Sequence, residues 1–506
     1  MTLDRTSITL TSAPKQYTHD QDKVVEPTAT VAKAMARLEQ LGEEGAAPTI
    51  AVRAVPIAGA YSFGASTAAL ATSGKGLTPA QAQASAVMEF CERYSWLHFD
   101  YASRPDYRFT SYEALLQRGV RTVVPSYFLN NFADLSGKDA ILAEIVRTPL
   151  KWVAGTRLDD SQPFYYPLNW HNLVFSSNGL ASGNSLEEAI LQGLCEVIER
   201  ENIYRLLMLG EAGFDVDPDS LQHPLLTTVR DNAAAGGIDF KIKNVTGELS
   251  VPTFIVRGRK QADAGLLTYE GVGQGCHTDP QKALMRAFSE YFEGLHSMNQ
   301  LQRALGPELR GLCEILPTQN LGFLVRHNAA MLDRSLGRQR LDEIPSLSRP
   351  DIKEEIDIVS AALHARACDV VVIDKTHPRL DIPVVRVFVP QFRSCMGTDT
   401  ASPSQTLSAV HHEAGNVADS ERHWLKARET LPILQVLRKV PVLGTFLGPI
   451  VQSQLGRPAF GNDYLDSMRQ IAKAKNNGLA QLAQTPNIEA ALPLLLKWIK
   501  PTQPEA

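Results

Sequence analysis

Three segments of the chain with helical periodicity carry the same polar pattern. A polar residue is followed by a second one four positions later and by glutamates eight and eleven positions after the first. In an α-helix these offsets fall within about 80° of one another, so each helix has one narrow polar strip on an otherwise apolar surface. A fold must bring these strips either to water or to a common site. The strips comprise Gln81, Ser85, Glu89 and Glu92; Glu188, Gln192, Glu196 and Glu199; and Lys282, Arg286, Glu290 and Glu293.

The repetition favours a common site. A single strip of this kind is usually solvated, but surface strips are wide and mix acids with bases. Here Arg93 and Arg200 directly follow the second glutamate in two of the three copies. Two carboxylates about 5 Å apart repel by roughly 3 kcal/mol at an effective dielectric constant of about 20, and a hard cation offsets that repulsion. The pattern therefore predicts a site for magnesium together with a nucleotide, with calcium as the alternative ion.

Glycine-containing stretches precede all three helices. Thr78, Ser185 and Asp279 are the expected N-caps, and Glu188 is expected to complete a capping box with Ser185. Glycine turns at helix starts expose backbone N–H groups that suit phosphate. The stretches match neither a Walker A loop nor a dinucleotide fingerprint, which indicates a nucleotide site of another type. They are GKGLTP at 74–79, SGNSLEE at 182–188 and GVGQGCHTDP at 271–280.

Strand-like runs alternate with long helical patterns over the first 395 residues, which predicts an α/β domain of mixed α+β type. The runs are TIAVRAVPIAG, STAALATSG, YYPLNW, FKIKNV, TFIVRGR, LLTYEGVG, DVVVID and IPVVRVFVP. We expect a polar N-terminal segment with a first helix at 1–45, the main domain at 46–395, a Ser/Thr/Pro-rich linker at 396–406 and a helical C-terminal region at 407–506. Within that region, VPVLGTFLGPIV at 440–451 is short and holds two prolines, which favours a packed hairpin over membrane contact.

Charge and cysteine content argue against several classes of function. The net charge is -5, and the basic residues are dispersed, so nucleic acid is not an expected ligand. The six cysteines include no CxxC pair, which argues against zinc and disulfides and for buried thiols in a reducing cytoplasm. Cys91 and Cys195 lie beside the glutamate strips and are interpreted as core residues. Without a signal peptide or a membrane-spanning run, we expect a soluble cytoplasmic protein.

Four segments of the chain resemble the YcaO family, and the resemblance spans roughly residues 20–395. They are SGKGLTPAQAQASAVMEFCERYSW, SSNGLASGNSLEEAILQGLCEVIER, GVGQGCHTDPQKALMRAFSEYFEG and DIPVVRVFVPQF. The resemblance implies a YcaO-type fold, with sheets flanked by long helices, that binds ATP and Mg2+. A further short match, KVVEPTAT, implies that Lys23 and Thr30 contact phosphate.

The resemblance also assigns site residues by their positions in the motifs. The implied nucleotide-binding residues are Lys23, Thr30, Ser85, Glu89, Glu92, Arg93, Asn184, Glu188, Gln192, Glu196, Glu199, Arg200, Arg286 and Glu290. The implied metal ligands are Glu89, Glu92, Glu196, Glu199 and Glu290. No catalytic residue is assigned. The chain departs from the family pattern at Glu293 and Leu295, where relatives usually have Gln and Arg, which removes one expected nucleotide contact.

The activity implied by the resemblance is ATP-dependent phosphorylation of a backbone amide oxygen in a peptide or protein, as in the biosynthesis of ribosomally made modified peptides. Sulfide as nucleophile gives a thioamide, whereas a Cys, Ser or Thr side chain gives an azoline. The sequence ends in KPTQPEA rather than the Pro-x-Pro-x-Pro tail of many azoline formers, which favours a thioamide or another non-azoline product. The alternatives are a cyclodehydratase and a non-catalytic ATP-binding accessory to ribosomal-protein methylthiolation. A TfuA-like or leader-peptide-binding partner and a homodimer are also expected.

Overall fold

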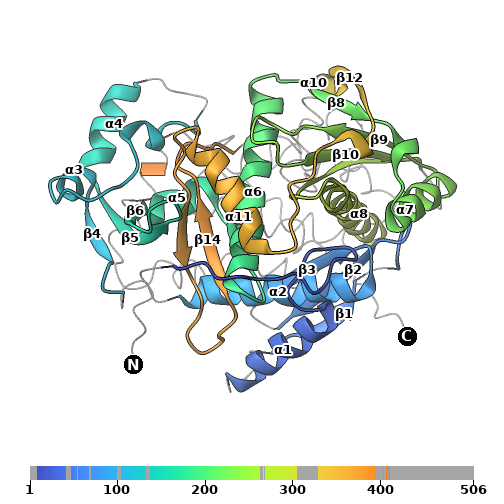
Figure 1. Ribbon diagram of the computed structural model, residues 1–506, viewed down its shortest axis with the longest axis horizontal. Coiled ribbons are helices and arrows are strands. Elements are labelled where there is room, and N and C mark those ends of the chain that lie inside the picture. Colours follow the sequence, from blue (N-terminus) through green and yellow to red (C-terminus); the bar gives the residue numbers. More distant parts are fainter. Residues whose placement is uncertain are drawn as a thin grey trace, which may run out of the picture.

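The computed structural model describes residues 8–41, 47–304 and 329–394, with short gaps at 54, 68–69, 100–103, 133–136, 263–265 and 267, and also residues 403, 406, 407 and 410. The strands form sheets of three, five and six strands, and long helices lie between and against the sheets (Figure 1). This mixed α/β architecture confirms the predicted fold class. The C-terminal region at 407–506, with the hairpin expected at 440–451, and the linker at 396–406 lie outside the described residues except at the four isolated positions.

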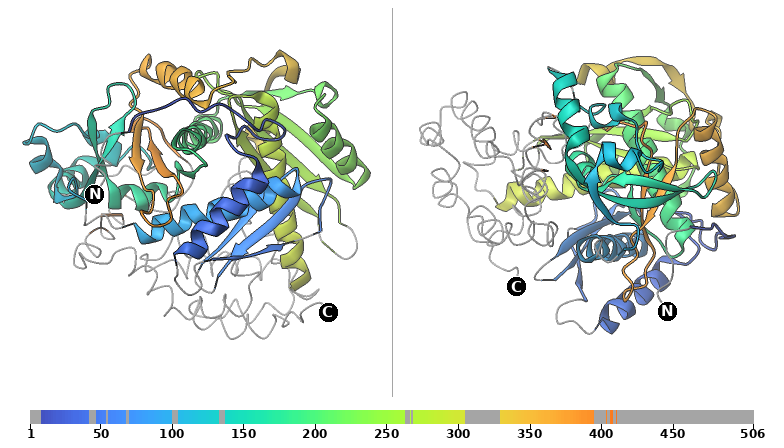
Figure 2. Two further views of the ribbon diagram at one scale, coloured as in Figure 1. Left: turned by 60° about the horizontal axis from the view of Figure 1, so that its bottom comes forward. Right: turned by 90° about the vertical axis from the view of Figure 1, so that its left-hand side faces the viewer.

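The first sheet is an antiparallel meander of β1 (Thr49–Val52), β2 (Tyr61–Ser66) and β3 (Ala71–Gly76). Two helices, α1 (Pro27–Gln40) and α2 (Pro79–His98), pack against each other beside this sheet (Figure 2). Their apolar faces share one buried cluster, in which Leu38 of α1 joins Val87 and Phe90 of α2. The face of α2 that carries its glutamates points away from this apolar cluster.

The second sheet has the order β11-β10-β9-β8-β12. Its strands are β8 (Gly213–Val216), β9 (Ile238–Asn244), β10 (Thr253–Lys260), β11 (Tyr269–Cys276) and β12 (Ser335–Gln339). Only β12 and β8 among these neighbours are parallel. Helix α8 (Pro280–Ala304) covers β10 and β11, and its Phe288, Tyr291 and Phe292 surround Phe240 of β9. The helices α7 (Pro224–Ala235) and α10 (Ala329–Asp333) and the 3-10 turns η2 (Pro218–Ser220) and η4 (Leu341–Glu343) complete this part.

The third sheet has the order β4-β5-β13-β14-β7, with β6 paired to β5. Its strands are β4 (Arg108–Ser111), β5 (Pro149–Arg157), β6 (Pro163–Pro167), β7 (Leu180–Ser182), β13 (Val371–Asp374) and β14 (Val384–Phe388). Helix α6 (Leu186–Met208) packs on β14 and β7 and lies between this sheet and the second one (Figure 1). The remaining elements are α3 (Tyr112–Leu116), η1 (Pro125–Phe128), α4 (Lys138–Arg147), α5 (Leu168–Phe175) and α11 (Ile352–His364).

One expected strand is only half a strand. The run YYPLNW leaves β6 at Pro167, and the residues from Leu168 onward form α5. Proline has no N–H to donate to a neighbouring strand, so it is a natural end for the ladder. The following residues then bury Trp170 and Val174 at helical spacing. The prediction of a continuous strand was wrong because a short apolar stretch is compatible with both strand and helix periodicity.

The three helices with acidic strips each follow a strand after a very short connection. The strand–helix units are β3–α2, β7–α6 and β11–α8. Thr78, Ser185 and Asp279 accept hydrogen bonds from backbone N–H groups of the first turns, which confirms the expected N-caps. The second half of the capping box is wrong, because Glu188 accepts from the backbone N–H of Asn184 instead.

The glycines before these helices lie in or beside strands rather than in phosphate-binding turns. Gly74 is in β3 and Gly273 and Gly275 are in β11, and each faces the backbone of the helix that follows. A Cβ atom added at Gly74 would lie 2.0 Å from the backbone nitrogen of Ala86, and one at Gly273 would lie 2.0 Å from the carbonyl oxygen of Ala287. The prediction of phosphate-binding turns is therefore wrong at these positions. Glycine is needed there because strand and helix are in backbone contact.

We expect Gly74→Ala to destabilise the fold by about 3 kcal/mol or more, because the added methyl group overlaps a helix backbone that cannot yield locally. The matched control is Gly64→Ala in β2 of the same sheet, where the nearest atoms belong to the flexible side chain of Arg53, at 3.3 Å. Urea unfolding of both variants checks this expectation. Equal stability of the two variants would contradict the close-packing explanation.

Candidate functional site

The acidic strips of α2, α6 and α8 face one cavity of about 280 Å³. Strand β3 and the segment before α1 supply the rest of the wall described here. The cavity brings together all five predicted metal ligands and most of the predicted nucleotide-binding residues. Those that line it are Lys23, Ser85, Glu89, Glu92, Arg93, Gln192, Glu196, Glu199, Arg200, Arg286 and Glu290.

Each pair of glutamates is bridged by one cation. On α2, Arg93 lies 3.5 Å from Glu89 and 3.2 Å from Glu92. On α6, the corresponding pair is held in the same way by an arginine one residue after the second glutamate. Arg200 lies 3.7 Å from Glu196 and 2.8 Å from Glu199. The arginines that follow the motifs thus hold the carboxylates of their own helices while they line the cavity.

The third pair takes its cation from another element. Lys75 of β3 lies 2.9 Å from Glu290 and 3.0 Å from Glu293 of α8. Ser73 of the same strand donates a hydrogen bond of 2.5 Å to Glu293. The strip of α8 is not followed by an arginine. Lys75 takes that role instead, although it is more than 200 positions away from Glu290 in the sequence. The sequence pattern of α8 gave no signal for this partner.

Burial and crowding change the proton affinity of the cavity acids. Burial, with Glu89 and Glu196 nearby, raises the pKa of Glu92 to about 8 despite Arg93. Burial, with Glu290 and Glu196 nearby, raises the pKa of Glu199 to about 7 despite Arg200. Arg93 and Arg200 therefore do not fully offset the burial of Glu92 and Glu199. On α8, by contrast, Lys75 and Ser73 hold the pKa of Glu293 below its ordinary value despite burial. A further positive charge in the cavity is electrostatically favourable.

Metal binding is expected to strengthen as pH rises. A raised pKa keeps Glu92 and Glu199 partly protonated near neutral pH, and a carboxylate must lose its proton to bind a metal. We expect Mg2+ affinity to increase between about pH 6 and pH 8, by up to about tenfold per pH unit for each proton displaced, and to level off above that range. Calorimetric titration of Mg2+ with a non-hydrolysable ATP analogue measures this. Glu92→Gln should remove the step at the highest pH, and a flat profile would contradict the expectation.

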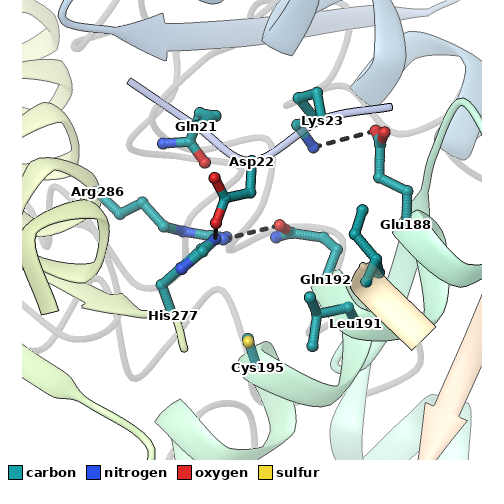
Figure 3. Close-up of a pocket in the computed structure, with 10 residues that line it drawn as sticks. Gln21, Asp22, Lys23, Glu188, Leu191, Gln192, Cys195, His277 and Arg286 are labelled. Carbon is teal, nitrogen blue, oxygen red and sulfur yellow. Dashed lines mark hydrogen bonds and ion pairs between the residues drawn. The ribbon is translucent and has the colours of Figure 1, made fainter. Parts of the chain in front are cut away.

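The other end of the cavity lies at the start of α6. Lys23 pairs with Glu188 at 3.2 Å, and Arg286 donates to the side chain of Gln192 at 2.8 Å, as Figure 3 shows. These residues also line a small adjoining pocket of about 10 Å³, room for about one water. Glu188 precedes Glu199 by eleven residues, which is about 16 Å along a helix axis. Lys23 is thus well separated from the acid pairs.

A buried charge network fixes the segment that carries Lys23. The carboxylate of Asp22 contacts Lys282 of α8 and lies 2.6 Å from Lys15. Lys15 in turn lies 2.5 Å from Glu355 of α11. The side chains of Lys15, Asp22 and Glu355 are each at most 3% exposed. The polar N-terminal segment is therefore tied to two helices of the main domain and forms part of the cavity wall.

Three implied site residues lie off the wall of the 280 Å³ cavity: Glu188, which lines the small adjoining pocket instead, Thr30 and Asn184. Thr30 is buried in α1, and its hydroxyl donates to the carbonyl oxygen of Glu26 at 3.0 Å. Asn184 donates its side-chain amide to Glu188 at 3.1 Å and so contacts the site only through that residue. The placement of Thr30 is at odds with direct phosphate contact.

The cysteines beside the acids are core residues, as interpreted from the sequence. Cys91 and Cys195 are almost completely buried, and each belongs to an apolar cluster of its helix. Burial also raises the pKa of the Cys91 thiol to about 12, so it is protonated at neutral pH. A thiol in this state is a poor nucleophile.

The donor set of the cavity fits magnesium bound together with a phosphate chain. Within the described residues, no three Asp, Glu, His or Cys side chains converge closely enough to hold a metal by themselves. Magnesium commonly takes only one or two carboxylates and completes its shell with phosphate oxygens and water. Glu92 and Glu199, one on α2 and one on α6, both line the cavity and could provide such carboxylates once they are deprotonated.

A mixed α/β protein whose helices direct paired carboxylates and arginines into one cavity has the construction of an ATP- and Mg2+-binding enzyme fold. The model of the YcaO cyclodehydratase family, described as ATP- and Mg2+-binding, matches residues 73–393. The chain belongs to this family. Membership confirms the family and cofactor predictions made from the motifs.

Curated relatives match parts of the chain. An uncharacterized protein of Methanothermobacter thermautotrophicus is 29% identical over 63% of this chain and 80% of its own length. An uncharacterized protein in the tfuA 3′ region of Rhizobium leguminosarum bv. trifolii is 27% identical over 42% of this chain and 52% of its own length. The ribosomal protein S12 methylthiotransferase accessory factor YcaO of Escherichia coli is 31% identical over 44% of this chain and 40% of its own length.

Solved structures share the fold. A heterocyclase in complex with substrate and cofactor superposes with a TM-score of 0.63 at 21% identity, covering 77% of this chain and 55% of that one. The YcaO protein of Methanopyrus kandleri, bound with AMPPCP and Mg2+, superposes with a TM-score of 0.53 at 20% identity, covering 75% of this chain and 94% of that one. Among the helices described for this chain, none is long and apolar enough to cross a membrane.

Proposed function

We propose that this protein uses ATP and Mg2+ to phosphorylate the oxygen of a peptide backbone amide and that the product is a thioamide. The observation that carries the proposal is the convergence on one cavity of about 280 Å³ of two complete arginine-bridged glutamate pairs, together with Glu290 and its partner Lys75. An amide oxygen is a poor leaving group, and phosphoryl transfer makes it a good one. The protein's task is then to position the reactants and to stabilise charge.

The reaction balances with sulfide as the nucleophile. Hydrosulfide adds to the amide carbon, and the carbonyl oxygen becomes a tetrahedral oxyanion. That oxyanion attacks the γ-phosphorus of ATP, the bond to the bridging oxygen breaks, and ADP leaves. The carbon–oxygen bond then breaks, phosphate departs with the former amide oxygen, and loss of the sulfur-bound proton leaves the carbon–sulfur double bond.

The residues of the cavity divide this work by position. Glu89, Glu92, Glu196, Glu199 and Glu290 would supply the carboxylates for Mg2+, one or two to an ion, and bound Mg2+ would neutralise phosphate charge. Arg93 and Arg200 lie beside these acids and would stabilise the charge that develops on the transferred phosphoryl group. Lys23, at the opposite end of the cavity, would contact the phosphate that is farthest from the γ-phosphate.

Support for the thioamide product comes from the Rhizobium relative, whose gene lies in a tfuA 3′ region. We include a TfuA-like or leader-peptide-binding partner and a homodimer in the proposal. We also include a cytoplasmic location in the proposal, because buried free thiols such as Cys91, Cys195 and Cys276 suit a reducing compartment.

The test is mass spectrometry of peptides incubated with the protein, Mg-ATP and sulfide. The peptides are synthetic versions of the short reading frames beside its gene, and the amide oxygen carries a heavy isotope. We expect the mass change of oxygen-to-sulfur exchange and transfer of the heavy oxygen to phosphate. Loss of one water would instead identify an azoline former.

Hydrolysis of ATP that is independent of every peptide, with no heavy oxygen in phosphate, would overturn the proposal. That outcome would favour the accessory role that the Escherichia coli relative is named for. The partner protein is included in a parallel reaction, so that a missing activator is distinguished from missing chemistry.

A further inference from the structure

A buried carboxylate in the segment before α1 lies next to the start of α2 and lines the cavity, and one of its oxygens has no hydrogen-bond partner among the described residues. Asp20 is only 1% exposed. Its Oδ2 atom accepts a hydrogen bond of 2.6 Å from the hydroxyl of Thr78, the N-cap of α2. Its Oδ1 atom makes no hydrogen bond within the part of the chain described here.

The position of this carboxylate is fixed rather than adaptable. Thr78, which donates to it, also accepts from the backbone N–H of Gln81 at 3.2 Å, so the hydroxyl cannot turn away without uncapping the helix. The hydroxyl of Tyr17 is also nearby, where burial and Asp20 together raise the pKa of that tyrosine. The Oδ1 atom is thus held in place as an acceptor on the wall that Asp20 shares with Gln21 and Gln81.

The two lysines that line the cavity pair with glutamates, as the two bridging arginines do. Lys23 pairs with Glu188, and Lys75 pairs with Glu290 and Glu293. An ionised carboxylate in this position repels phosphate. A nucleotide therefore has reason to place its phosphates at the end with Arg93 and Arg200 and its nucleoside at the end with Asp20.

We infer that Asp20 is a specificity residue for the nucleoside, with Oδ1 accepting a hydrogen bond from a neutral donor of the bound nucleotide. An ionised carboxylate can only accept. The neutral donors of ATP are its ribose hydroxyls and the exocyclic amine of adenine, and both would satisfy the same oxygen. The inference rests on the proposed function, because it requires that a nucleotide occupies this cavity.

The decisive variant is Asp20→Asn. Its amide oxygen can still accept from Thr78, while its NH2 group turns the free acceptor into a donor. We expect Mg-AMPPCP to bind this variant about 10- to 100-fold more weakly, as measured by calorimetry on the full chain. The matched control is Asp351→Asn, because Asp351 also anchors the N-terminal segment, through Ser12 and Ala13, but does not line the cavity.

Analogues identify the donor by competition against Mg-AMPPCP. We use the triphosphates of 2′-deoxyadenosine, of 3′-deoxyadenosine and of purine riboside, which lacks the exocyclic amine. For the native protein, the analogue that lacks the donor should bind more weakly than ATP. For Asp20→Asn, the same analogue should bind no more weakly than ATP, as a double-mutant cycle requires for two groups in contact.

The outcomes separate the two levels of argument. If the native protein does not bind Mg-AMPPCP, the proposed function fails. If it binds, and Asp20→Asn binds equally well, only this inference fails. Equal weakening by Asp351→Asn would also overturn it, because the loss would then come from a loosened segment.

Discussion

Replacing Glu199 by glutamine is expected to reduce peptide-dependent ATP turnover by at least about 100-fold, which is the scale for removing one electrostatic group from a transition-state site. Glutamine keeps the size of the side chain but removes the negative charge. Glu199 lies between Arg200 and the acids Glu196 and Glu290, where burial raises its pKa to about 7. Its loss removes a metal ligand of the proposed site and the carboxylate that lies 2.8 Å from Arg200.

Glu201→Gln is the matched control. Glu201 is on the same helix and similarly buried, at 8% exposed against 6% for Glu199, but it faces Arg393 instead of the cavity. Turnover with this variant should stay within a few-fold of the native rate. Thermal stabilisation by Mg-AMPPCP gives a second measurement, because a ligand raises stability only as far as it binds the native state. Unchanged turnover and stabilisation in Glu199→Gln would remove this glutamate from the site.

Asp22→Ala should lower the free energy of unfolding by about 3–5 kcal/mol, the usual cost of removing one partner from a buried ion pair. Lys282 would lose its carboxylate, and Lys15 would keep Glu355 and the hydroxyl of Ser348. Two cations would then remain in the interior with one carboxylate between them. Urea unfolding without nucleotide measures this cost.

The comparison for Asp22 is Asp357→Asn. Asp357 pairs with Lys353 at 2.6 Å on the surface of α11, where both side chains are more than one-third exposed. Exposed pairs of this kind contribute about 0.5 kcal/mol or less. Should Asp22→Ala cost no more than Asp357→Asn, the N-terminal segment would not depend on this network.

The part of the site that the sequence predicted is the part governed by helical periodicity. The offsets that align Ser85 with Glu89 and Glu92 also determine which way these side chains point, so one face of α2 could be assigned to the cavity before any contact was known. The same reasoning held for α6. It placed Gln192, Glu196 and Glu199 on one side without information on the neighbouring elements.

The site residues that the sequence did not predict lie on elements without helical periodicity and far from the helices in the chain. Lys75 is on a strand, and its pairing with Glu290 depends on how β3 and α8 meet across the sheet edge. Asp20 lies in irregular chain that has no period to indicate where it points. Glycine was misread for a related reason. A glycine in a turn and one against a helix backbone look alike in sequence, although Gly74 and Gly273 serve the second purpose.

The bridging cations have a consequence for how the site is filled. In the free protein each glutamate pair is already occupied by an internal counter-ion, Arg93, Arg200 or Lys75. A bare divalent ion entering alone must compete with side chains that gain no new partner when they are displaced. A triphosphate arriving with the ion offers them its oxygens. The site should therefore bind Mg2+ together with a triphosphate more strongly than Mg2+ alone, because the internal cations oppose a metal ion that brings no phosphate oxygens.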